Sequence, residues 1–133
     1  MAYKLERAQS QNIELDVGGE IIYVSIGGMG VYKKVLDAQG KLKDIQTKID
    51  TLTKNKSEIT PELVEFLGQT IIYFFNVVFG EKNTEKILAF YEGNYDEMLL
   101  KVYPFILKEF IPALKGNAEA ESRAYAKRLA GAS

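Results

Sequence analysis

The sequence predicts a mainly helical α+β fold, with an N-terminal β-hairpin followed by a bundle of about four to five helices. Residues 13–26 alternate apolar and polar side chains around a Gly18–Gly19 pair, and this pattern is typical of two strands joined by a two-residue loop. From residue 31 onward the apolar residues recur every three or four positions. Proline and glycine then divide the chain into segments of helical length.

The length of 133 residues and the apolar fraction of 47% indicate one domain that can bury a core. We expect a flexible N-terminal arm at residues 1–12, a single domain at 13–116 and a flexible, alanine-rich tail at 117–133. The arm is polar and has no apolar period. The tail carries only Tyr125 and Leu129 as large apolar side chains, so we expect at most a weak helix detached from the core.

In the predicted hairpin, pairing across Gly18–Gly19 sets Val17 opposite Glu20. The apolar face then consists of Ile13, Leu15, Val17, Ile22, Val24 and Ile26. The other face consists of Glu14, Asp16, Ile21, Tyr23 and Ser25. Because a lone hairpin is marginally stable in water, its apolar face must pack on helices. The glycines at 27, 28 and 30 lack the spacing of a phosphate-binding loop and are interpreted as a connector.

Residues 31–56 carry a heptad pattern typical of a helix. Its two apolar series are Val35, Leu42, Ile49 and Ala38, Ile45, Leu52. This seam is interpreted either as packing within the chain or as a subunit interface. The same region carries seven Lys and three Asp, a balance of +4, whereas residues 57–100 carry eight acids and two Lys, a balance of −6. These charges form either solvated faces or complementary docking patches.

Residues 59–80 are expected to form the central core helix. Thr60 is a suitable N-cap, Pro61 suits the first helical position and Gly80 suits the end of the helix. The polar residues form one narrow stripe, made of Glu62, Glu65, Gln69 and Asn76. The remaining surface is apolar and is predicted to be buried; it comprises Leu63, Phe66, Leu67, Ile71, Phe74, Phe75, Val78 and Phe79.

Two further helical segments are expected after Gly80. A short helix, capped by Asn83 or Thr84, is predicted to end at Gly93. A longer one begins near residues 94–96 and closes at Gly116. The prolines at 104 and 112 interrupt its hydrogen bonds, so we expect a kink or two abutting pieces.

The composition argues against catalysis. The chain has no His and no Cys, which removes the commonest general base, the soft metal ligands and the thiol nucleophile. The carboxylate pairs Glu62/Glu65 and Asp96/Glu97 both fall at predicted helix starts, where acids are favoured by the helix dipole. We therefore expect no enzyme activity, no cofactor and no metal. With a net charge of −1 we also expect no binding to nucleic acid or membrane, which leaves protein binding.

The order of segments resembles the tail assembly chaperones of long-tailed (siphovirus-type) phages and prophages of Gram-positive bacteria. The hairpin at 13–24 (IELDVGGEIIYV) leads into a helical body containing 75–88 (FNVVFGEKNTEKIL), 94–99 (NYDEML) and 105–114 (FILKEFIPAL). The resemblance covers residues 13–115 and consists of patterns of size and polarity.

The resemblance implies a non-enzymatic factor of the host cytoplasm that keeps the tape measure protein soluble and recruits tail tube subunits. We expect two surfaces to bind these partners or to mediate self-association. They are the helix seam (Val35, Ala38, Leu42, Ile45, Ile49, Leu52) and the polar face of the hairpin (Glu14, Asp16, Ile21, Tyr23). The alternatives are a structural or tail completion protein that is retained in the virion, and a small regulatory nucleic-acid-binding protein.

Overall fold

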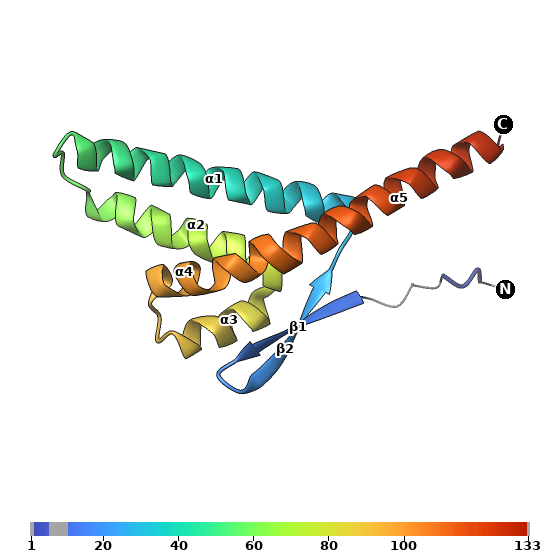
Figure 1. The fold of residues 1–133 in the computed structure, drawn as a ribbon, viewed down its shortest axis with the longest axis horizontal. Coiled ribbons are helices and arrows are strands. Elements are labelled where there is room, and N and C mark those ends of the chain that lie inside the picture. Colours follow the sequence, from blue (N-terminus) through green and yellow to red (C-terminus); the bar gives the residue numbers. More distant parts are fainter. Residues whose placement is uncertain (1, 6–10, 133) are drawn as a thin grey trace.

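The computed structural model describes residues 2–5 and 11–132 and has the expected architecture of a hairpin followed by helices (Figure 1). Strands β1 (Gln11–Val17) and β2 (Glu20–Ile26) precede helices α1 (Met29–Lys54), α2 (Pro61–Phe79), α3 (Glu81–Phe90) and α4 (Tyr95–Phe105). A π-helical segment, η1 (Ile106–Phe110), then leads into α5 (Ile111–Ala132). In the ribbon, the α1–α2 hairpin extends from one end of the molecule and α5 extends from the other.

The hairpin has the predicted register. Val17 pairs with Glu20, Leu15 with Ile22 and Ile13 with Val24. Gly18 and Gly19 adopt φ values of 61° and 95°, which a side chain would strain. Ile22 and Val24 are buried and the rest of the predicted apolar face is half-buried against the helices.

The predicted N-terminal arm is shorter than expected, because the strand begins at Gln11. Residues 2–5 have no regular structure and are exposed. Residues 1 and 6–10 of the arm lie outside the described residues.

Helix α2 is central, since it contacts α1, α3, α4 and β2. Its predicted cap is present: the hydroxyl of Thr60 accepts a hydrogen bond from the backbone N–H of Leu63 at 3.2 Å. Gly80 ends the helix with a φ of 80°. Phe74 and Phe75 are fully buried, and their rings meet edge to face at 6.1 Å. Among the described helices, only α2 is long and apolar enough to cross a membrane, a property it shares with core helices of soluble proteins.

One prediction for α2 is wrong. Phe66, expected in the core, is 55% exposed. The reason is geometric: its side chain lies on the face of α2 beside α1 rather than between α2 and the rest of the body.

Helix α3 begins earlier than predicted, directly after Gly80, and its N-cap makes no side-chain hydrogen bond. Asn83 therefore lies inside the helix, where its amide donates to the carbonyl oxygens of Tyr23 (2.9 Å) and Phe79 (3.2 Å). Helix α4 begins within the predicted range of 94–96, and the side-chain oxygen of its N-cap, Asn94, accepts from the N–H of Glu97 at 3.2 Å.

The helical path continues from α4 to α5 through both prolines, as three abutting segments. The π-helical η1 lies between Pro104 and Pro112. A proline removes one backbone donor, and a wider turn lets the following residues change their hydrogen-bond partners without ending the helix. The buried residues Met98, Val102, Ile106, Phe110 and Leu114 lie along this path.

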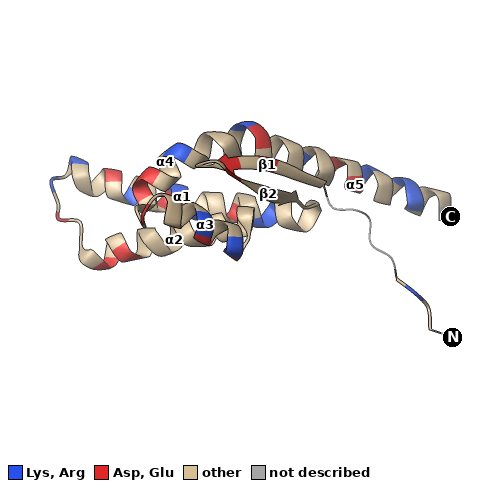
Figure 2. Ribbon diagram, turned by 90° about the horizontal axis from the view of Figure 1, so that it is seen from below, with Lys and Arg blue, Asp and Glu red and all other residues tan. Residues whose placement is uncertain are grey.

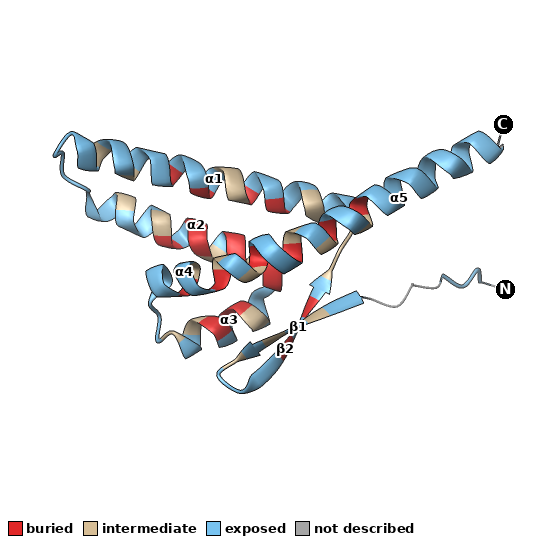
Figure 3. Cartoon of the chain, viewed as in Figure 1, coloured by how far each residue is buried: buried red, intermediate tan, exposed pale blue. Residues whose placement is uncertain are grey.

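The predicted end at Gly116 is wrong, and so is the description of 117–133 as only weakly structured, since α5 runs to Ala132. Alanine has the highest helix propensity, which offsets the cost of one interior glycine. Burial in the core ends at Ala118, since residues 119–131 are exposed (Figure 3), although Glu121 and Ser122 still contact Met29.

Candidate protein-binding surfaces

The predicted polar face of the hairpin is exposed. Ile21 is 43% and Tyr23 is 59% accessible, and they pair across the strands with Asp16 and Glu14. Two of these residues also have structural bonds. The carboxylate of Asp16 accepts from the Gly19 N–H at 2.7 Å and so holds the turn, and the carbonyl of Tyr23 is bonded to Asn83. The accessible apolar area on this face therefore comes from Ile21 and the Tyr23 ring.

The predicted helix seam is mostly core. Val35, Ala38, Leu42 and Ile45 are buried within this chain, where α1 packs on α2 and α5. The first two-thirds of the seam is therefore not available to a partner, which corrects its assignment as a binding surface. Ile49 and Leu52 are half-buried near the tip of the α1–α2 hairpin.

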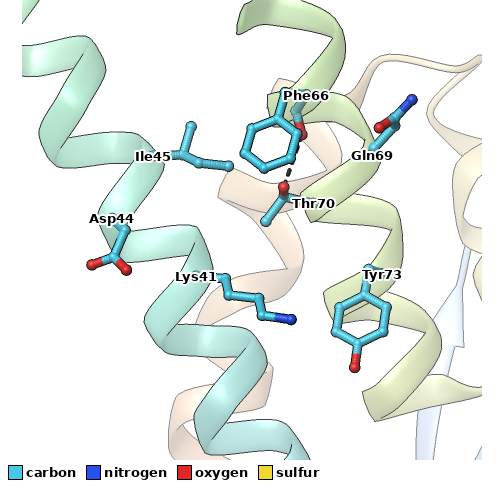
Figure 4. A pocket seen from close by; sticks show the side chains of 7 residues that line it. All are labelled: Lys41, Asp44, Ile45, Phe66, Gln69, Thr70 and Tyr73. Carbon is cyan, nitrogen blue, oxygen red and sulfur yellow. Dashed lines mark hydrogen bonds between the residues drawn. The ribbon is translucent and has the colours of Figure 1, made fainter.

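The structure also has a groove between α1 and α2, which was not among the surfaces predicted from the sequence. It is open to solvent and has a volume of about 430 Å³, and Figure 4 shows it from close by. Its lining consists of Lys41, Asp44, Ile45, Phe66, Gln69, Thr70 and Tyr73. Phe66 and Tyr73 are 55% and 47% exposed, and Nζ of Lys41 lies 5.2 Å from the centroid of the Tyr73 ring. The seven-residue spacing of Phe66 and Tyr73, next to the polar stripe of α2, is the sequence signal that marks this surface.

Charges border this groove on both sides. On α1, Lys34, Lys41 and Lys48 are seven residues apart and therefore share one side of the helix. On α2, the only charged residues are Glu62 and Glu65. None of these five residues forms an ion pair with another described residue. Figure 2 shows the acidic start of α2 and the mixed charges of α1.

The third surface is the far end of α5. Leu114 and Ala118 are buried, whereas Tyr125 and Leu129, further along the same stripe, are 59% and 56% exposed. This stripe keeps its helical spacing after the body ends.

The last attachment of α5 to the body is polar. The Met29 N–H donates to a carboxylate oxygen of Glu121 at 3.1 Å. The Ser122 hydroxyl lies 3.0 Å from the Met29 sulfur and 2.8 Å from the Ala118 carbonyl oxygen, within its own helix. Glu121 thereby supplies an acceptor and a negative charge to the N-terminus of α1, whose own N-cap, Gly28, has no side chain. A side chain at Gly28 would meet this carboxylate and displace it, so the glycine leaves room for the Glu121 contact.

The described residues hold no group of three or more acids that could bind a metal ion. Of the carboxylate pairs considered from the sequence, Asp96 and Glu97 lie in the first turn of α4 and Glu62 lies in the first turn of α2, where the helix dipole stabilises acids. Glu65 lies in the second turn of α2. Burial, and secondarily the charge of Glu97, raises the pKa of Tyr91.

Comparisons with protein families, with curated proteins and with solved structures find no match.

Proposed function

We propose that this protein is a tail assembly chaperone of a long-tailed phage or prophage, which holds the tape measure protein soluble in the host cytoplasm. The assignment to phage tails rests on the order of segments described above. The mode of action rests on the surfaces of the molecule, and no residue is assigned a catalytic role.

The observation that carries the proposal is the stripe on α5. Leu114 and Ala118 lie on this stripe and pack within the body. Tyr125 and Leu129 lie further along the same stripe and are exposed to solvent. Exposed apolar groups arranged with helical period are suited to an amphipathic helix lying alongside. A long helical client with apolar stripes aggregates when those stripes are bare, and covering them keeps it in solution.

The face of the hairpin that carries Ile21 and Tyr23 is the second surface offered to partners, and we assign it to tail tube subunits. Here a bound chain would contact two exposed apolar side chains flanked by Glu14 and Asp16. Cross-strand pairs of this kind form a small amphipathic patch.

The test is co-expression with the neighbouring tape measure and tail tube genes, measuring how much of each partner stays in the soluble fraction. We expect the wild type to keep the tape measure protein soluble and the double variant Tyr125→Asp/Leu129→Asp to lose this effect. The double variant Ala120→Asp/Ala124→Asp is the matched control, because it adds the same two negative charges to the same exposed helix away from the stripe.

Three outcomes are informative. If the wild type leaves the tape measure protein insoluble, the chaperone function is refuted. If the double variant solubilises it as well as the wild type does, the function stands and the α5 site is wrong. If Ala120→Asp/Ala124→Asp fails equally, this part of the helix tolerates no added negative charge and the stripe has no special role.

A further inference from the structure

The face formed by α1 and α2 carries three parallel rows of side chains. The first is the lysine row of α1, made of Lys34, Lys41 and Lys48. The second is the apolar row of Phe66 and Tyr73 on α2, with Ile45 in the groove between the helices. The third row is acidic and consists of Glu62 and Glu65 on α2. They lie seven and four residues before Gln69, which lines the groove, and so share its side of the helix.

Apart from the contact of Lys41 with the Tyr73 ring, the charges and rings of these rows are open to a partner. The two aromatic side chains of the second row remain about half exposed, and the lysine and acidic rows form no ion pair among the described residues. Figure 4 shows the Lys41 side chain reaching across the groove toward Tyr73, and Asp44 is the acid among the residues that line the α1 side. A groove bordered by lysines on one side and acids on the other is self-complementary, since a two-fold rotation exchanges the two sides.

We propose that a second copy of this chain covers this face in an antiparallel, two-fold arrangement, with the α2 of each copy lying in the α1–α2 groove of the other. The acidic row of one copy then faces the lysine row of its partner, and the reverse contact forms by symmetry. The four helices make a bundle in which Phe66 and Tyr73 become interior residues.

The register of this pairing follows from the sequence. Within one chain Lys41 is level with Tyr73, since its Nζ lies over the ring. If Phe66 of one copy packs against Tyr73 of the other, antiparallel pairing of the two α2 helices places Glu65 opposite position 74 of the partner helix. This position is one residue past Tyr73, so Glu65 lies about 1.5 Å along the helix axis from the level of the partner's Lys41. Glu62 then falls opposite position 77, between Lys41 and Lys34.

The distribution of charge on α1 and α2 favours a second copy of this chain as the occupant of the groove. The only charged residues of α2 are acidic. The groove side of α1 presents three lysines one heptad apart and one acid, Asp44, so its balance is positive. An α2 helix is therefore attracted to the α1 of another copy, and two α1 helices repel one another. Two helices about 10 Å apart, over the roughly 28 Å length of α2, offer on the order of 500 Å² per copy. That area is at the low end for specific interfaces, so we expect a dimer that dissociates on dilution.

Sedimentation velocity over a range of protein and salt concentrations tests the proposal. We expect a monomer–dimer equilibrium that shifts toward the monomer at high salt, because exposed ion pairs are screened. Phe66→Ser should abolish the dimer while leaving the far-UV circular dichroism spectrum unchanged, because that ring is already exposed.

Charge reversal tests the geometry. Lys41→Glu and Glu65→Lys should each raise the dissociation constant at least ten-fold, because each two-fold dimer loses two attractive contacts and gains two repulsive ones. An equimolar mixture of the two variants should dimerise again, since one carries acids at both positions and the other carries lysines. Lys43→Glu is the control and should have no effect, because it lies on the solvent side of α1, away from the groove.

A wild type that stays monomeric at all concentrations overturns the proposal. A dimer that tolerates Phe66→Ser, or single variants that fail to recover on mixing, overturns it as well. A monomer that needs Phe66 to bind the tape measure protein would assign this face to that client instead, and would equally refute the dimer.

Discussion

Leu114 and Leu129 have the same side chain and lie on the same stripe of α5, one inside the body and one beyond it. Leu114 is fully buried, whereas Leu129 is 56% exposed. Truncating a buried leucine to alanine removes its contacts and leaves a cavity, which costs about 2–5 kcal/mol. Leucine and alanine differ little in helix propensity, so the two substitutions perturb the helix itself almost equally.

We expect Leu114→Ala to lower the free energy of unfolding by about 3 kcal/mol and Leu129→Ala to lower it by less than about 0.5 kcal/mol. Urea unfolding followed by circular dichroism measures both. With a slope of about 2 kcal/mol per molar urea, the midpoint of Leu114→Ala should fall by about 1.5 M. Both variants are compared at one protein concentration, because self-association adds to the apparent stability.

A loss of less than about 1 kcal/mol for Leu114→Ala would show that α5 does not enter the core as described. A loss of similar size at Leu129 would show that the far end of α5 packs on the body in solution. Either result refutes the division of this helix at Ala118.

Three smaller perturbations probe individual features. Thr84→Val should raise stability by about 1 kcal/mol in thermal unfolding, because the buried Thr84 hydroxyl has no hydrogen-bond partner among the described residues and valine has the same shape. Gly40→Ala should raise stability by about 0.5–1 kcal/mol, since nothing lies within 4 Å of the added carbon in α1. Gly80→Ala should lower stability by about 1–2 kcal/mol, because a side chain strains the backbone at a φ of 80°. In an absorbance titration Tyr91 should ionise above the usual tyrosine range, because burial and then Glu97 raise its pKa. Since the folded-state pKa exceeds the unfolded one, stability should fall as the pH rises through the folded-state value, and Tyr91→Phe should remove this component.

The features that the sequence predicted well are those set by local chemistry. The register of the hairpin follows from two glycines that adopt positive φ, and the start of α2 follows from Thr60 and Pro61. Each of these signals acts within a few residues, so no knowledge of the tertiary structure is needed to interpret it.

The wrong predictions of burial and exposure concern helix faces that extend beyond the neighbouring element that covers them. Helical period identifies which residues share a side of a helix, and it contains no information on where the neighbouring helix ends. Phe66 has the spacing of a core residue, yet its side of α2 meets only the edge of α1. Val35 and Ile45 have the spacing of an interface and are core residues, because α2 and α5 lie against them.

Helix length connects the fold to its candidate surfaces. The buried residues of α1 end at Ile45, and the helix continues to Lys54, about 13 Å further. In α5 they end at Ala118, and the remaining helix to Ala132 adds about 21 Å. An isolated helix of that length is marginal in water, so its stability depends on what packs along it. Both extensions carry large apolar side chains at helical spacing, and both therefore gain stability when another helix covers them. The fold thus places its two candidate docking helices at opposite ends of one core (Figure 1).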